Sequence, residues 1–193
     1  MNSVHLRRTL SACYGVCVAG LLAGTGCVDD RESGDGEGAI ASAITLDPNA
    51  NYTIVGAQST KCVGVVDASK ASNARLEIRT CSGNASQRFH PEAMGGGVFR
   101  LRSELSGLCV DVLGASLDDG ALVIQFTCGT GTNQQWSFTD LAGGTERITA
   151  RHSGKVLDVT GTQTADGTLI EQWASNNGAN QQFTLVRAVA PLL

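Results

Sequence analysis

Apolar side chains alternate with polar or small ones along several short segments of this chain. A period of two predicts β-strands with one half-buried face. No run of ten residues combines a helical period with caps, so the chain is predicted to be all-β, with short strands. The alternating pairs recur as Val63 and Val65, Val110 and Val112, and Leu157 and Val159.

The alternation belongs to an internal repeat of 47 residues, which a Gln-x-aromatic motif marks most clearly. Three copies of a unit too small to bury its own apolar face predict a shared core about an axis, with the sheet closed to remove exposed edges. Each ring is expected in the core, on the same strand face as its glutamine, and each glutamine is expected to satisfy buried backbone groups. The matched sets are Gln87-Arg88-Phe89, Gln134-Gln135-Trp136 and Gln181-Gln182-Phe183; Ile54, Leu101 and Ile148; and Leu76, Val123 and Ile170.

Turn residues separate the predicted strands at matched places in the three copies. Asp-Gly is a favoured hairpin dipeptide, and Ser-Gly also marks turns. The repeats are therefore predicted to be joined hairpins. The turns are Ser72-Asn73, Asp119-Gly120 and Asp166-Gly167, and Ser59-Thr60, Ser106-Gly107 and Ser153-Gly154.

The first 27 residues predict export. Arg7 and Arg8 precede an apolar run from 10 to 24, which is too short to span a bilayer. The segment resembles a bacterial lipoprotein signal that ends at Cys27, the residue that carries lipid in such proteins; ordinary secretion with cleavage nearby is the alternative. Residues 28–50, which are acidic and poor in large apolar side chains, are predicted to be a flexible linker. The protein is then expected to be membrane-anchored in the bacterial cell envelope, or secreted.

Composition and cysteine spacing narrow the function classes. The net charge of −4 argues against a nucleic-acid partner. Cysteines 19 positions apart in copies one and two favour two equivalent disulfides, and the absence of Cys-x-x-Cys from the mature chain argues against zinc. No metal or cofactor is predicted. The expected pairs are Cys62–Cys81 and Cys109–Cys128.

Residues 51–187 resemble the ricin-B-chain-type lectin domain, also known as the family 13 carbohydrate-binding module. The resemblance rests on the three in-register repeats, on Leu108-Cys109-Val110-Asp111-Val112, and on Thr132-Asn133-Gln134-Gln135-Trp136. It implies a β-trefoil with pseudo-threefold symmetry, sugar binding and no catalysis. Residues 188–193 then form a C-terminal tail.

The resemblance implies a sugar site built from an Asp, an aromatic platform and an Asn beside the motif Gln. Copy one has Gly64, Arg79 and Ser86 at these places and is predicted not to bind. Copies two and three keep the set, and Glu171 in copy three is expected to accept a further hydroxyl. The predicted site residues are Asp111, Phe126, Asn133 and Gln134, and Asp158, Glu171, Trp173, Asn180 and Gln181.

The sequence thus predicts a monomeric, non-catalytic lectin module that binds galactose-type or xylan-type glycans through copies two and three. Its predicted partners are an oligo- or polysaccharide and, through the lipid anchor alone, a membrane. Two other classes compete with this interpretation. A protein-interaction or inhibitor role occurs on the same fold. Enzymatic activity is disfavoured, because no nucleophile elbow, His-Glu-x-x-His motif or phosphate loop is present.

Overall fold

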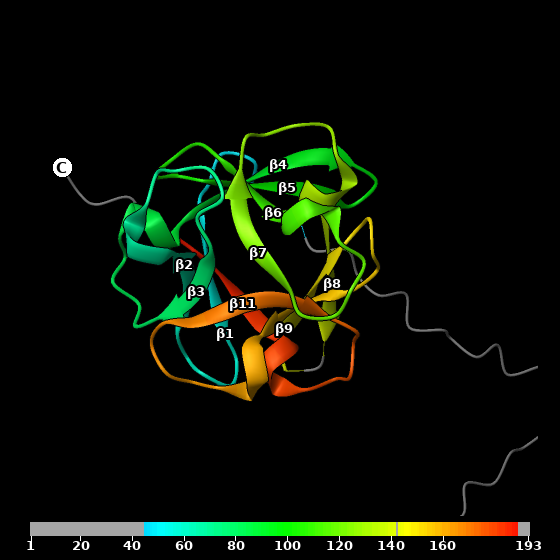
Figure 1. Cartoon of the computed structure of the whole chain (residues 1–193). Helices are drawn as coiled ribbons and strands as arrows, with labels where there is room; N and C mark the ends of the chain where they lie inside the picture. The colour runs from blue at the N-terminus through cyan, green and yellow to red at the C-terminus, as the bar shows by residue number, and fades with distance from the viewer. Residues whose placement is uncertain (1–44, 142, 189–193) are drawn as a thin grey trace, which may run out of the picture. The chain divides into compact units, whose positions relative to one another are not determined.

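The computed structural model of the chain describes residues 45–141 and 143–188, which form a β-barrel capped by hairpins (Figure 1). Each 47-residue repeat supplies four strands. Repeat one contains β1 (Tyr52–Gly56), β2 (Cys62–Val65), β3 (Leu76–Arg79) and β4 (Phe89–Gly95). Repeat two contains β5 (Val98–Ser103), β6 (Cys109–Val112), β7 (Ala121–Phe126) and β8 (Trp136–Leu141). Repeat three contains β9 (Thr145–Ala150), β10 (Val156–Val159), β11 (Thr168–Trp173) and β12 (Phe183–Arg187).

The first and fourth strands of each repeat close the barrel. Antiparallel pairing runs from β1 to β4, β5, β8, β9 and β12 and returns to β1. The second and third strands of each repeat form the hairpins β2–β3, β6–β7 and β10–β11. Strands β3, β7 and β11 surround the centre of the view in Figure 1, where β11 pairs with both β3 and β7. This architecture is the predicted β-trefoil.

The core consists of residues that occupy matched places in the three repeats. Phe89, Trp136 and Phe183 are at most 1% exposed, which confirms that the ring of each Gln-x-aromatic motif is buried. The predicted alternating residues of the second strands lie in the same cluster. A core shared by three equivalent units explains the 47-residue period, since no single repeat encloses it. The other matched sets are Ile54, Leu101 and Ile148, and Leu76, Val123 and Ile170.

Two disulfides connect the predicted cysteines, Cys62–Cys81 and Cys109–Cys128, with Cα–Cα distances of 5.0 and 5.1 Å. Each disulfide ties the second strand of its repeat to the segment just after the third strand. The predicted turns are also present: Gly107, Gly120, Gly154 and Gly167 all have positive φ. None of the helical segments in the described part of the chain is long and apolar enough to cross a bilayer.

Polar side chains connect one repeat to the next. The buried Gln125 of repeat two donates hydrogen bonds to the carbonyls of Ser69 and Ala71 in repeat one. Gln172 makes the matched pair of bonds from repeat three to Ser116 and Asp118 of repeat two.

Two turn aspartates make a second kind of inter-repeat link. Asp119 of repeat two accepts bonds from Lys155 and from the amide of Ala174, both in repeat three. Asp166 of repeat three binds Lys61 and Thr80 of repeat one in the same way. The turns between the capping strands therefore also join the repeats.

Three details of the sequence interpretation were wrong. The glutamines do not share a strand with the rings, because Gln87, Gln134 and Gln181 each end a 3₁₀ turn: η2 (Ala85–Gln87), η4 (Thr132–Gln134) and η6 (Ala179–Gln181). The second strands are not half-buried. All residues of β2, β6 and β10 are buried, because the 3₁₀ turns pack over the face that points away from the core.

The third correction concerns the boundary between linker and domain. Residues 45–50 belong to the folded domain, since Leu46 is buried in the core and the amide of Asp47 donates to the Tyr52 hydroxyl at 2.9 Å. Asp47 also pairs with Arg187 of β12 at 2.7 Å. The predicted signal (1–27), residues 28–44 of the predicted linker and residues 189–193 of the tail lie outside the described residues.

Candidate functional site

In repeat two, the 3₁₀ turn η4 holds the side chain of Asp111 in place. Asn133 donates from Nδ2 to Asp111 Oδ1 at 2.9 Å, and Gln134 donates from Nε2 to Asp111 Oδ2 at 2.6 Å. Gln134 also donates to the carbonyl of Thr127 at 3.0 Å and accepts from the amide of Gly129 at 2.8 Å. The carboxylate is therefore fixed by two amides, with acceptor capacity left on both of its oxygens.

Repeat three builds the same arrangement with nearly the same distances. Asn180 donates to Asp158 Oδ1 at 2.9 Å, and Gln181 donates to Asp158 Oδ2 at 2.7 Å. Gln181 also bonds the carbonyl of Ala174 at 3.1 Å and the amide of Asn176 at 2.9 Å. The motif glutamines do bond backbone groups, as predicted, but these groups belong to exposed loop residues and not to buried ones. The further bond of the glutamines to the carboxylate was missed, because the repeat pattern alone does not show which side chains face one another across the strand and the turn.

Burial changes the acidity of these carboxyl groups. It raises the pKa of Asp111, while the bonds from Gln134 and Asn133 and the charge of His152 act in the opposite direction. Burial likewise raises the pKa of Asp158 against the bonds from Gln181 and Asn180. Burial also raises the pKa of Glu171, and the neighbouring charges of Asp158 and Asp119 add to that rise, whereas the Thr160 hydroxyl opposes it.

An exposed aromatic ring stands at the end of the third strand in both repeats. Phe126 is 41% exposed and Trp173 is 40% exposed, although each belongs to a largely buried strand. In repeat two, the ring borders a cavity of about 360 Å³ that also touches Asp111 and Asn133. Acceptors on the floor and an aromatic face on the wall suit a neutral sugar ring, which offers hydroxyls and an apolar C–H face.

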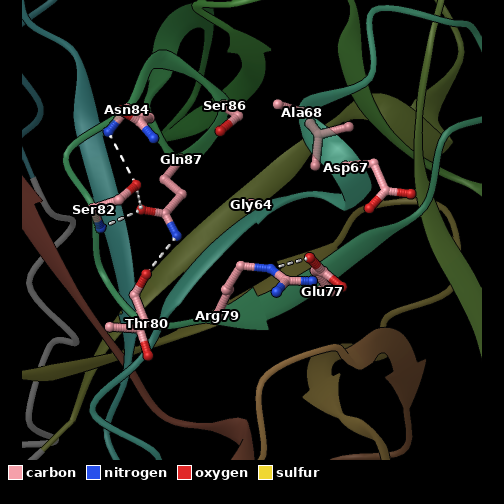
Figure 2. A pocket seen from close by; sticks show the side chains of 11 residues that line it. Gly64, Asp67, Ala68, Glu77, Arg79, Thr80, Ser82, Asn84, Ser86 and Gln87 are labelled. Carbon is pink, nitrogen blue, oxygen red and sulfur yellow. Dashed lines mark hydrogen bonds and ion pairs between the residues drawn. The ribbon is translucent and has the colours of Figure 1, made fainter.

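Repeat one lacks this chemistry. Gly64 and Ser86 stand in place of the carboxylate and the amide, and Arg79 stands in place of the ring, where it donates from Nε to Glu77 at 2.7 Å. Figure 2 shows the resulting cavity, about 270 Å³, with Gln87 on one side and the Arg79–Glu77 pair on the other. Gln87 still binds the amide of Ser82 and the carbonyl of Thr80, so its structural role remains.

Two glycines complete the sites and were missed from the sequence. A Cβ at Gly131 would lie 2.4 Å from Asn133 Oδ1, and one at Gly178 would lie 2.5 Å from Asn180 Oδ1. A side chain there would displace the asparagine that holds the carboxylate. Repeat one has Asn84 at this place and no asparagine two positions later. The signal was present in the repeats: glycine and asparagine occur together in copies two and three and are both lost in copy one.

The sequence matches the family described as the ricin-type beta-trefoil lectin domain over residues 50–186. The chain belongs to this family. The predicted resemblance to ricin-B-type lectins is thereby confirmed. The family is one of lectin domains, so membership supports carbohydrate binding in general and points to a non-catalytic domain. No curated protein matched the chain in sequence.

Solved structures agree with this assignment. A designed threefold-symmetric protein, ThreeFoil, is 39% identical with a TM-score of 0.70, over 70% of this chain and 97% of that one. An exo-β-1,3-galactanase from Clostridium thermocellum is 36% identical with a TM-score of 0.71, over 74% of this chain and only 31% of that one. A Macrolepiota procera ricin B-like lectin in complex with lactose, 19% identical with a TM-score of 0.65, shares the fold over 75% of this chain and 99% of its own.

The described residues offer no obvious metal centre. Within 45–141 and 143–188, no group of three or more His, Cys, Asp or Glu side chains is placed to hold a metal ion.

Proposed function

We propose that this protein is a non-catalytic lectin that binds galactose-type or xylan-type glycans through repeats two and three. The observation that carries the proposal is the pair of matching sites, each with a buried Asp held by Asn and Gln beside an exposed ring. Repeat one, which has the same order of strands and 3₁₀ turns, lacks all of these groups but Gln87. A structural role for the set would require it in every repeat.

Each residue has a distinct role in the proposal. Asp111 and Asp158 accept hydrogen bonds from sugar hydroxyls, and Phe126 and Trp173 stack on the apolar face of the ring. Gln134 and Gln181 act as positioning residues, because their amide N–H groups are already used by the carboxylate and a backbone carbonyl. In repeat three, Glu171 lies directly opposite Asp158 on the paired strand and supplies a further acceptor.

Location and avidity form the second part of the proposal. Lipid attached to Cys27 would hold the domain at the cell envelope through the acidic segment 28–44, and the shallow sites would each bind weakly. A millimolar site corresponds to about −4 kcal/mol. Two sites on one tethered domain raise the avidity for a polysaccharide that reaches both. Mass spectrometry of the membrane fraction, with Cys27→Ala as the control, tests the anchor.

Glycan-array binding of the purified chain, beside an Asp111→Ala/Asp158→Ala double variant, tests the sugar sites. Binding by the parent and its loss in the folded double variant are expected. A folded parent that binds no glycan would refute the proposal and favour a protein-interaction role, which a pull-down insensitive to free sugar would then support. Release of sugar from the array glycans would instead reveal an enzyme.

A further inference from the structure

The two sites differ at the position that faces the carboxylate across the hairpin. In repeat two, Asp111 on β6 is paired with Ile124 on β7. In repeat three, Asp158 on β10 is paired with Glu171 on β11. The site of repeat two therefore combines a carboxylate with an aliphatic side chain, whereas the site of repeat three combines two carboxylates.

A second matched position changes in the same direction. Leu113, which is 44% exposed, borders the cavity of repeat two together with Ile124 and Phe126. The residue 47 positions later is Thr160, a polar residue whose hydroxyl oxygen is buried. Two neighbouring positions are thus apolar together in one site and polar together in the other.

The rims of the sites differ as well. Asn73 of repeat one borders the site of repeat two. The matched residue at the site of repeat three is Gly120, and an added Cβ there would lie 3.7 Å from the Trp173 ring and 3.9 Å from Glu171 Oε2. A glycine at this place leaves Glu171 and the ring open from that side.

We infer that the two sites select different sugars: the repeat-two site takes a residue that carries a methyl group, and the repeat-three site takes one with a hydroxyl or ammonium donor there. The inference rests on the proposed lectin function and names the ligand class of each site. A methyl group against Leu113 and Ile124 leaves water for an apolar wall. A hydroxyl in the same place loses its water partners without gaining an acceptor, whereas beside Glu171 it gains one.

The methyl group has two common sources in glycans, a 6-deoxy carbon and an acetamido group, and two sugar pairs separate them. D-Galactose and 6-deoxy-D-galactose differ only at carbon 6, which carries a hydroxyl in the former and is a methyl group in the latter. Galactosamine and N-acetylgalactosamine differ only at the amino group, which carries a methyl-bearing acetyl group in the latter. Calorimetric titration of the Asp158→Ala chain reports on repeat two alone, and titration of the Asp111→Ala chain reports on repeat three alone.

In at least one pair, we expect repeat two to bind the methyl-bearing sugar about fourfold tighter than its partner sugar. This factor is the gain in affinity expected from burying one methyl group. Repeat three should prefer the other member of that pair. Equal preferences at the two sites, in both pairs, would overturn the inference and leave the proposed function standing. If neither single-site chain binds any of these sugars or any other glycan tested, both the inference and the proposed function are overturned.

Two conservative variants show which side chains cause the difference. Leu113→Thr, at an exposed position, should reduce the methyl preference of repeat two without affecting folding. Glu171→Gln keeps the shape of repeat three but removes its charge, so its preference for galactosamine should fall. Unchanged preferences in both variants, with folding confirmed by circular dichroism, would contradict the assignment to these walls.

Discussion

Replacing Gln181 with alanine should weaken sugar binding in repeat three as well as destabilise the fold, whereas Gln87→Ala in repeat one should only destabilise it. The two side chains make matched bonds to the loop before their 3₁₀ turns. Gln181 binds the amide of Asn176 and the carbonyl of Ala174, and Gln87 binds the amide of Ser82 and the carbonyl of Thr80. Only Gln181 also holds a carboxylate, that of Asp158. The pair therefore separates the structural role from the functional one.

The expected losses of stability follow from counting the bonds. Gln87 makes three neutral bonds, including one from the Ser82 hydroxyl at 2.9 Å, worth about 1 kcal/mol each. Gln181 makes two neutral bonds and one to a charged group, which is worth about 1.5–3 kcal/mol. The free energy of unfolding should fall by about 3 kcal/mol in Gln87→Ala. In Gln181→Ala it should fall by about 0.5–2 kcal/mol more.

Urea denaturation measures the two stabilities, and titration with the best glycan measures binding. Both variants are placed in the Asp111→Ala background, so that repeat three supplies the signal. Loss of one of the two donors that orient Asp158 should weaken binding about tenfold, equivalent to about 1.4 kcal/mol. Binding by Gln181→Ala at parental affinity would refute the positioning role. An equal loss of binding in Gln87→Ala would show that general destabilisation is the cause.

Three further predictions concern acidity, packing and the junctions between repeats. Burial raises the pKa of Asp111 and Asp158, so glycan affinity should fall as the pH drops through those raised values, above the usual Asp value of about 3.9. In that range the folded state binds more protons than the unfolded chain, so these two groups should add stability as the pH falls; denaturation of the parent beside an Asp111→Asn/Asp158→Asn variant checks the sign. Gly64→Asp should not create a third sugar site, because an added Cβ would lie 2.8 Å from Gln87 Cγ; we expect a loss of about 1–3 kcal/mol from overpacking, and a stable variant with a third binding event would contradict this. Asp166→Ala should lower stability only slightly, since the carboxylate accepts bonds from the amide and hydroxyl of the exposed Thr80, and a thermal midpoint equal to the parent's would show that this junction contributes nothing.

The fold was predictable because the 47-residue period of the sequence places equivalent residues of the three repeats in one core with threefold symmetry. Ile54, Leu101 and Ile148 face one another only if three equivalent strands surround an axis, and all three are buried. The limits of the pattern appear at the second strands. Alternation predicted one exposed face there, but the turns that carry Asn and Gln fold back over it. Such coverage depends on the conformation of a loop, and hydrophobic periodicity carries no information about that.

The candidate sites were predictable as sets of residues but not as networks. The family resemblance pointed to Asp111 and Asp158 and to Asn133 and Asn180, and comparison of the repeats showed that repeat one has lost their counterparts. It did not reveal that Gln134 and Gln181 use their N–H groups on the carboxylates, which changes their role from contact to positioning. Leu113 was also missed, since a single exposed leucine after a strand is unremarkable until the cavity beside it is known.

Repeat one shows why fold and binding can vary separately in this architecture. Its glutamine keeps the bonds that close the loop onto the 3₁₀ turn, and its ring Phe89 keeps its place in the core, so the barrel retains three equivalent supports. The binding groups that have changed belong to the hairpin (Gly64 and Arg79) and to the 3₁₀ turn (Ser86). Because the core requires all three repeats, while the carboxylate, amide and ring of each site come from its own hairpin and turn, one site is free to disappear, and the remaining two are free to differ. The contrast between Ile124 and Glu171 is the difference that such independence permits.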